Sequence, residues 1–221
     1  PALVTLLHLC DSLFPIGAFA HSDGLEAATA SGRISTGDDF AHWLAATRDH
    51  VIRRCEGPAV ARAWQAASTG DVDQLAILDG DVFAMRPSAS GREAVRAMGT
   101  RLLRSWAQMY PAGATLPLFQ RQCRLTLPVA FGVVCCGGAV GQRDAVAAYA
   151  YTRLASSLSA AMRLMPLGQQ QGHALLAASL AGLPTLARDV VDDGRPLMAF
   201  TPAIDIAAMQ HQYVHSRLFR S

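Results

Sequence analysis

The chain has 221 residues, a formal net charge of +2, and 19 basic side chains, all of them arginine. Its hydrophobic fraction is 51% and its charged fraction 16%, against roughly 25% charged residues in an average globular protein. This composition excludes a disordered chain, which needs low hydrophobicity and high net charge. The absence of lysine excludes a Schiff-base enzyme and a nucleotide-binding loop that ends in Gly-Lys-Ser/Thr. The chain is therefore not an ATPase or GTPase of the common kind.

Apolar residues recur at helical spacing, and clusters of Gly and Pro separate the helical segments. The segments expected as helices are, in chain order, about 2–13, 22–31, 36–56, 58–68, 71–85, 88–108, 128–140, 142–165, 169–180 and 202–215. Alternation typical of strands is almost absent. The sequence thus predicts an all-α fold, a single-domain bundle of roughly eight to ten helices over residues 1–221.

Several local signals set the expected helix ends. Thr36 or Asp38 is expected to cap the third helix, and Gly32 to end the second in a left-handed conformation. Gly57-Pro58 is expected to end one helix, with Pro58 in the first turn of the next.

Charge, cysteines and hydropathy favour a soluble cytoplasmic protein. A net charge of +2 supplies no concentrated basic face, so nucleic acid is not an expected partner. The five cysteines are odd in number and irregularly spaced, which favours reduced thiols. The longest apolar stretch, about 127–140, contains Pro and Gly and is shorter than the roughly 20 residues that span a bilayer. No membrane segment and no signal peptide are expected.

Motifs for catalysis and metal binding are weak. His211 and His215 are four residues apart on an expected helix, so both could face one metal ion, but no third ligand stands at motif spacing. Ordinary surface or interface histidines are the simpler interpretation. The pairs Asp38-Asp39 and Asp192-Asp193 lack the third acid of a magnesium-binding Asp-Asp-x-x-Asp pattern. The residues by themselves therefore predict no catalytic site and no firm metal site.

One segment, residues 9–26, departs from generic helical composition. Asp11 and Ser12 can bond the backbone where the first helix stops, and Gly17 permits a tight turn that directs Phe14 and Phe19 inward. The simplest interpretation is an ordered loop between two helices. A loop this rich in aromatic residues and glycine also indicates a surface that binds another molecule.

This segment resembles the signature of the UreF family of urease accessory proteins, close to Asp-Ser-x-Phe-Pro-x-Gly-x-Phe-x-His-Ser-x-Gly-Leu-Glu. The matching residues here are Asp11, Ser12, Phe14, Pro15, Gly17, Phe19, His21, Ser22, Gly24, Leu25 and Glu26. Three further segments match in the expected order, at 90–103, 166–172 and 217–221, the last as Arg-Leu-Phe-x-Ser. One departure is His211-Gln212, where the family often has His-Glu.

The resemblance implies an all-α, dimeric, cytoplasmic scaffold without catalytic activity of its own. Members of this family join a UreD-type protein (UreH in some lineages) and recruit the GTPase UreG, and the assembly delivers nickel to the urease apoprotein. No tightly bound cofactor is expected, because nickel is handled by the complex.

The resemblance also suggests which residues contact the partners. Residues 216–221 are expected to form a flexible tail that docks on the UreD-type protein through Arg217, Leu218, Phe219 and Ser221. The surface that UreG meets is expected to include Phe14, Pro15, Gly17, Phe19, His21, Ser22 and Glu26.

Two other classes remain for comparison. A helical small-molecule enzyme or ligand-binding protein of the thiaminase-like type is the main alternative, and it would need a pocket with convergent acids or a bound group. A DNA-binding repressor is disfavoured, because residues 1–35 contain a single basic residue, Arg33.

Overall fold

The computed structural model describes residues 2–114 and 124–221, and within these ranges it contains helices and no strand. Where α3, η2 and α4 are counted as one helix, and α10 and α11 as another, the described residues hold nine helices. The predicted all-α fold of eight to ten helices is therefore confirmed. The elements are α1 (Ala2–Leu9), η1 (Ala18–Ala20), α2 (Leu25–Ala30), α3 (Gly37–Ala46), η2 (Thr47–Glu56), α4 (Gly57–Thr69), α5 (Val72–Ala84), α6 (Ala89–Met109), η3 (Pro111–Gly113), α8 (Leu127–Gly137), α9 (Gln142–Leu164), α10 (Gln169–Leu180), α11 (Leu183–Asp193), α12 (Pro202–Gln210) and η4 (His211–Tyr213).

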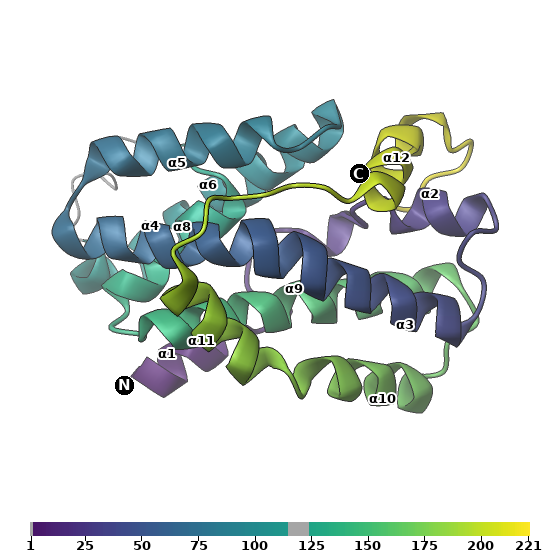
Figure 1. Ribbon diagram of the computed structural model, residues 1–221, viewed down its shortest axis with the longest axis horizontal. Coiled ribbons are helices and arrows are strands. Elements are labelled where there is room, and N and C mark those ends of the chain that lie inside the picture. Colours follow the sequence, from purple (N-terminus) through teal and green to yellow (C-terminus); the bar gives the residue numbers. More distant parts are fainter. Residues whose placement is uncertain (1, 115–123) are drawn as a thin grey trace.

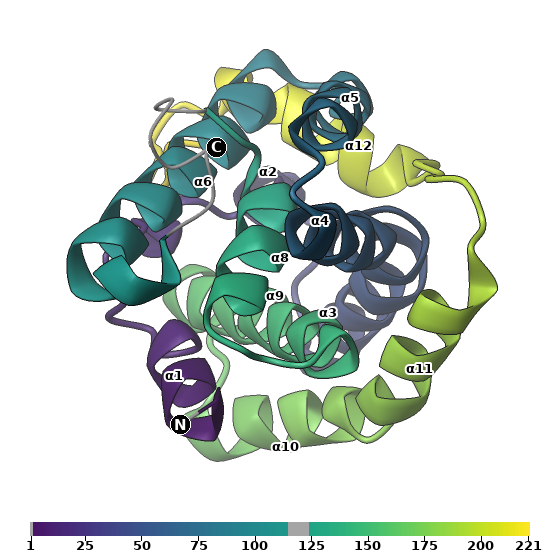
Figure 2. The same ribbon diagram turned by 90° about the vertical axis from the view of Figure 1, so that its left-hand side faces the viewer.

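Helix α8 lies at the centre of the bundle, where it packs against α4, α6 and α9 (Figure 2). All nine residues of the segment 127–135 are buried. A helix that is apolar around its whole circumference needs such an enclosed position. The apolar stretch noted at 127–140 is thus explained by the core of the bundle.

Helices α10 and α11 pack on the outer side of α9 (Figure 1). The stretch Gln169–Asp193 is, by length and composition only, apolar enough to cross a membrane, and 33% of its apolar window is buried. In α11 the buried residues are Leu183, Leu186, Ala187 and Val190. This spacing places them on one helix face, which is the pattern of an amphipathic helix packed on a protein core.

Several predicted helix ends are confirmed. Thr36 caps α3 in a reciprocal capping box with Asp39, and the side chains of Asp71 and Ser88 accept hydrogen bonds at the starts of α5 and α6. Gly32, just after α2, has a φ of 73°. These ends were predictable because each depends on local residues, either a capping side chain at the first turn or a glycine that adopts a positive φ after the last turn.

The predicted break at Gly57-Pro58 is wrong, because the chain stays helical from Gly37 to Thr69. The intervening segment η2 is π-helical, and the Gly57 N–H donates to the carbonyl of Ile52, five residues earlier. Since Pro58 has no N–H, it cannot make the i→i−4 bond to the carbonyl of Arg54 that an α-helix would contain. The wider π-helical turn accommodates the proline, so the helix continues where the sequence had suggested that it ends.

The carbonyl of Arg54 accepts a hydrogen bond from a distant segment. After α11, residues 194–201 run across the face of the α3–α4 rod (Figure 1), and the Met198 N–H donates to the Arg54 carbonyl at 2.9 Å. The Arg62 guanidinium also donates to the carbonyl of Gly194 at 3.2 Å. This strap therefore places α12 on the far side of the rod, beside α2.

The last predicted helix is shorter than expected. Helix α12 ends at Gln210, a single 3-10 turn follows, and residues 214–221 are not helical. The predicted extension to residue 215 is wrong because the chain turns toward the loop between α1 and α2, where its polar groups find partners.

Candidate functional site: a platform of loop and tail

The loop between α1 and α2 is held in one conformation by its own polar groups. The Asp11 carboxylate accepts a hydrogen bond from the Leu13 N–H at 2.7 Å, and Phe14 is buried. Gly17 has a φ of 76°, as the predicted tight turn requires. Phe19, which was expected to point inward, instead lies 72% exposed. The loop therefore presents an aromatic side chain on a fixed backbone.

The C-terminal segment lies directly on this loop. The Arg220 N–H donates to the Ala20 carbonyl at 2.8 Å, and the main-chain oxygen of Ser221 accepts from the Ser22 N–H at 2.6 Å. The Ser221 hydroxyl and the His21 Nδ1 are 2.7 Å apart. We call residues 10–26 together with 211–221 the loop–tail platform.

Glu26 connects the two halves of the platform from below. The residue is 3% exposed, and its carboxylate accepts hydrogen bonds from the N–H groups of Leu218, at 2.5 Å, and Phe219, at 3.3 Å. The Nε2 of His211, a residue 1% exposed, lies 2.7 Å from the same carboxylate. Among the described residues no arginine pairs with Glu26. Its carboxylate is thus satisfied almost wholly by the tail.

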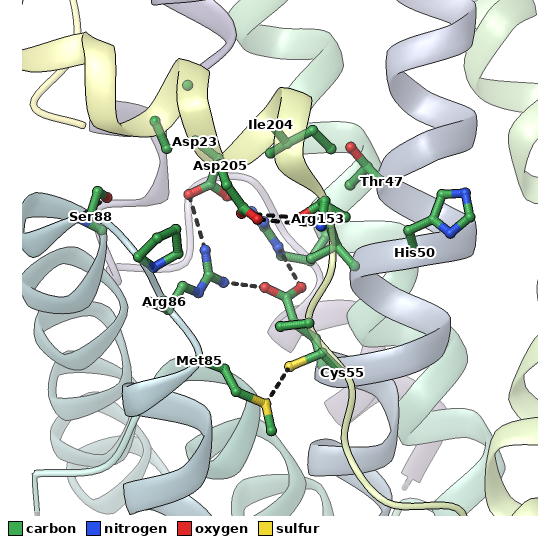
Figure 3. A pocket seen from close by; sticks show the side chains of 18 of the residues that line it. Asp23, Thr47, His50, Cys55, Met85, Arg86, Ser88, Arg153, Ile204 and Asp205 are labelled. Carbon is green, nitrogen blue, oxygen red and sulfur yellow. Dashed lines mark hydrogen bonds and ion pairs between the residues drawn. The ribbon is translucent and has the colours of Figure 1, made fainter.

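A second acid of the loop, the half-buried Asp23, ties the loop to the core (Figure 3). Its carboxylate pairs with Arg153 of α9 and, at 3.6 Å, with Arg86, which follows α5. Both arginines also pair with Glu56 of η2, which is 1% exposed. Burial by itself raises the pKa of Asp23, but Arg153 and Arg86 outweigh it and lower the pKa to about 2. We call these four residues the ionic quartet.

The ionic quartet lines a small cavity of about 70 Å³ beneath the strap and α12 (Figure 3). Polar groups such as Thr47, Ser157 and Asp205 lie on its wall together with apolar side chains. Cys55 also borders it, and burial raises the pKa of this thiol to about 12. A thiol of this kind stays protonated and unreactive at neutral pH.

Three arginines surround the exposed side of the loop without an acidic partner within ion-pair distance in the described part of the chain. The guanidinium of Arg101 lies beside Gly17, and Arg163 donates to the Phe19 carbonyl at 2.9 Å. Arg163 also covers the ring of the buried Phe219, with 4.3 Å between guanidinium carbon and ring centre. Arg220 belongs to the tail itself. The platform therefore has a positively charged rim.

The structure brings together the two sets of residues that the sequence had assigned to different partners. Of the loop set, Phe14, Ser22 and Glu26 are buried, Gly17 and His21 are half-buried, and Pro15 and Phe19 are exposed. Of the tail set, Phe219 and Ser221 are buried, while Arg217 and Leu218 face solvent, Leu218 with 60% exposure. That any of them contacts a partner stays a prediction.

The two histidines considered as metal ligands do not share a helix face. His211 is turned inward to Glu26, whereas His215 is exposed in the nonhelical segment. Across residues 2–114 and 124–221, no group of three or more His, Cys, Asp or Glu side chains is placed to hold a metal ion.

Sequence reasoning did not find the ionic quartet. Glu56, Arg86 and Arg153 come from segments about 30 and 67 residues apart, and none stands in a recognisable motif. Asp23 lies inside the matched segment, at a position where the family signature allows any residue. The one available signal was composition. Because the chain has no lysine, a buried carboxylate that pairs with a permanently charged side chain has to pair with arginine.

Two apolar regions adjoin the platform. A groove of about 720 Å³ runs between α1, the loop and α9, and small α9 residues such as Ala155 and Ser156 form its floor. On α12 the exposed residues Ile206 and Met209 continue to Tyr213, so one apolar stripe lies next to the tail.

Comparisons with known proteins agree with the resemblance seen in the sequence. A family model described as UreF matches residues 34–180, more than half of the chain. The urease accessory protein UreF of Dechloromonas aromatica (strain RCB) is 34% identical over 223 residues, which cover 99% of this chain and 97% of that protein. UreF proteins of Polaromonas sp. and Lachnoclostridium phytofermentans are 32% and 30% identical over 100% and 99% of this chain, and over 95% and 98% of their own lengths.

We predict that Arg153→Met lowers the free energy of unfolding by about 3–5 kcal/mol, because it leaves Asp23 and Glu56 with Arg86 as their one remaining cation. The matched control is Arg143→Met, on the same helix, whose pair with Asp192 is exposed and should contribute less than about 1 kcal/mol. Urea denaturation measures both. Equal effects of the two substitutions would contradict the structural role given to the ionic quartet.

We also predict a pH dependence that originates at Asp23. Since its folded pKa of about 2 lies below the unfolded value of roughly 4, its contribution is present above pH ~4 and is lost as the pH falls toward 2. The unfolding free energy should therefore fall by about 2 kcal/mol more in the wild type than in Asp23→Asn over this range. Asp39 also has a pKa of about 2 and is present in both proteins. If the wild type and Asp23→Asn lose stability in parallel, the acid sensitivity originates at other groups such as Asp39 and not at Asp23.

Proposed function

Because this chain belongs to the UreF family of urease accessory proteins, we propose that it is the helical scaffold on which a UreD-type (UreH-type) protein and the GTPase UreG meet during urease maturation. In this proposal it acts in the cytoplasm, performs no catalysis and couples GTP hydrolysis by its partner to nickel delivery into the urease apoprotein. Nickel is the cargo of the complex, and the chain holds no tightly bound cofactor. A lysine-free chain fits this role, since the nucleotide chemistry belongs to the partner.

The observation that carries the proposal is the loop–tail platform. Ordered loops with exposed aromatic side chains are costly unless they bind something. Here the exposed side chains of Phe19 and Leu218 belong to two segments that lie almost 200 residues apart in the sequence. Hydrogen bonds between these segments hold them together. Such a surface suits a protein that holds two partners in a defined relative position.

The tail side of the platform is assigned to the UreD-type partner. Leu218 and Arg217 point outward there, with Phe219 and Ser221 anchoring the segment from within. The apolar stripe on α12 extends this side, and Tyr213 is 79% exposed. Apolar and aromatic side chains of this kind form the centre of stable protein interfaces.

The loop side is assigned to the GTPase. Phe19 and Pro15 are its outward residues. Its rim consists of Arg101, Arg163 and Arg220, which form no ion pair with any described acid. A rim of positive charge accelerates association with an acidic surface and selects its orientation. We therefore expect the GTPase to present acidic residues to this side.

A second copy of the chain is assigned to the groove between α1 and α9. The exposed side chains of Leu3, Val4 and Leu7 form an apolar ridge beside the groove floor of small residues. A ridge and a groove on the same face can satisfy each other across a two-fold axis. Since the loop also lines this groove, a dimer of this form sets two platforms side by side.

The alternative of a thiaminase-like enzyme or ligand-binding protein has no comparable support. The cavity at the ionic quartet is small, and the two acids of the quartet already pair with arginine. Full-length similarity to urease accessory proteins favours the scaffold.

We predict that Leu218→Ala weakens binding of the UreD-type protein and that Phe19→Ala weakens binding of the GTPase, each by roughly tenfold or more, as expected for exposed interface anchors. Both side chains face solvent, so folding should be unaffected. Calorimetric titration of the purified partners measures each affinity. Ile77→Ala, at an exposed apolar residue of α5, is the control. Wild-type affinities for both variants would refute the assignment of the platform.

We further predict that Tyr151→Arg converts a dimer to a monomer in light scattering, because it places an unpaired charge in the groove beside α1. Tyr151 is partly exposed, so the variant should fold. Ile77→Arg, on the far side of the bundle, should leave the mass unchanged. If both variants keep the wild-type mass, the groove is not the dimer interface.

A further inference from the structure

We infer that the strap and the rod beside it form a docking groove for an acidic, extended segment of a partner protein. The groove, of about 760 Å³, lies between η2, the C-terminal end of α11 and the strap, and none of the described residues 211–221 borders it. It shares no lining residue with the surfaces assigned above to the UreD-type protein, the GTPase and a second copy of the chain. The inference therefore goes beyond the proposed function and does not depend on where the tail lies.

The strap has the alternation of an extended strand. Leu197 is buried and Ala199 lines the cavity of the ionic quartet, whereas Met198 between them is 49% exposed and lines the groove. Side chains that alternate between two sides in this way indicate extended backbone. In such backbone, consecutive N–H groups point to opposite edges of the chain. Because the Met198 N–H donates to the Arg54 carbonyl of the rod, the Ala199 N–H points away from the rod.

This outward edge of the strap has no hydrogen-bonding partner in the described part of the chain. No described group accepts from the N–H of the exposed Ala199 or donates to its carbonyl oxygen. The Arg62 guanidinium, which donates to the Gly194 carbonyl, holds the start of the strap in place. A fixed, exposed main-chain edge of this kind binds an extended peptide as an added strand. The occupant that fits is thus an extended segment and not a helix.

The groove also carries an excess of positive charge. Each of its three aspartates already pairs with an arginine, in the pairs Asp189–Arg53, Asp192–Arg143 and Asp193–Arg195. Arg54 lines the groove as well, and neither Arg54 nor Arg62 forms an ion pair with any described acid. Exposed positive charge accelerates and orients association with an acidic partner. Charge complementarity therefore selects carboxylates in the segment that docks here.

Apolar side chains lie between these charges and distinguish a protein segment from a simple anion. Pro58, Val190 and Met198 line the groove together with the arginines. A phosphate group would pair with the arginines but would leave the apolar residues and the strap edge unused. A segment that alternates acidic and apolar residues contacts all three, because its alternate side chains point to opposite sides.

The test uses the purified full chain and a defined probe, a fluorescently labelled peptide of sequence Asp-Val-Asp-Val-Asp-Val-Asp with blocked ends. Fluorescence anisotropy at low ionic strength should show saturable binding. Arg54→Glu should weaken it by about tenfold or more, because the substitution reverses the charge beside the peptide. The matched control is Arg104→Glu, at an exposed arginine of α6, which should leave the affinity within about twofold of the wild type.

A second variant tests the main-chain part of the groove without a change of charge. Ala199→Pro removes the outward N–H and is compatible with extended backbone at this residue and the one before it. It should also weaken the peptide by about tenfold, and circular dichroism verifies that each variant is folded.

Three results would overturn the inference. The first is a wild-type affinity in Arg54→Glu or Ala199→Pro, or an equal loss in Arg104→Glu. The second is equally tight binding of the basic peptide Arg-Val-Arg-Val-Arg-Val-Arg. The third is displacement of the acidic peptide by inorganic phosphate beyond that caused by sodium chloride of the same ionic strength, which would assign the groove to a simple anion.

Discussion

The ionic quartet is the interaction on which the rest of this structure depends. Removal of four charges from water is costly unless each is paired, and only the simultaneous presence of the loop, η2, the end of α5 and α9 pairs them all. The two cations are arginines, whose planar guanidinium groups each reach two carboxylates. A lysine would offer a single point of charge. The quartet therefore sets the position of the loop relative to the helical core.

The loop connects the helical core to the tail because two of its acids bond to different parts of the structure. Asp23 reaches into the core, and Glu26, three residues later, reaches toward the tail. Gly24 stands between them with a φ of 87°, and a Cβ there would lie 2.7 Å from the backbone nitrogen of Ala208 in α12. The close approach of α12 and the reversal between the acids thus need the same glycine. Core, loop and tail are connected through four consecutive positions.

Local features of the sequence predicted most of the fold. Helical periodicity and the caps at Thr36, Asp71 and Ser88 depend on residues within one or two turns, so they could be recognised without tertiary information. The failures share a different cause. Pro58 was expected to break a helix, yet the helix continues, and the Arg54 carbonyl to which Pro58 cannot donate accepts from the distant Met198. The extension of α12 was expected from periodicity, yet His211 leaves the helical path for a partner at Glu26.

The candidate site divides in the same way. The sequence by itself determined an all-α chain without lysine, the matched loop at 9–26 and the Arg-Leu-Phe-x-Ser segment, because residue type and order carry that information. Only the tertiary structure decided that loop and tail form one surface and which of their residues face solvent. It also showed that Asp23 bonds the loop to the core and that Glu26 bonds the loop to the tail. These properties depend on contacts between residues from about 30 to almost 200 positions apart. Pairings over such distances leave no periodicity or spacing in the sequence from which they could be derived.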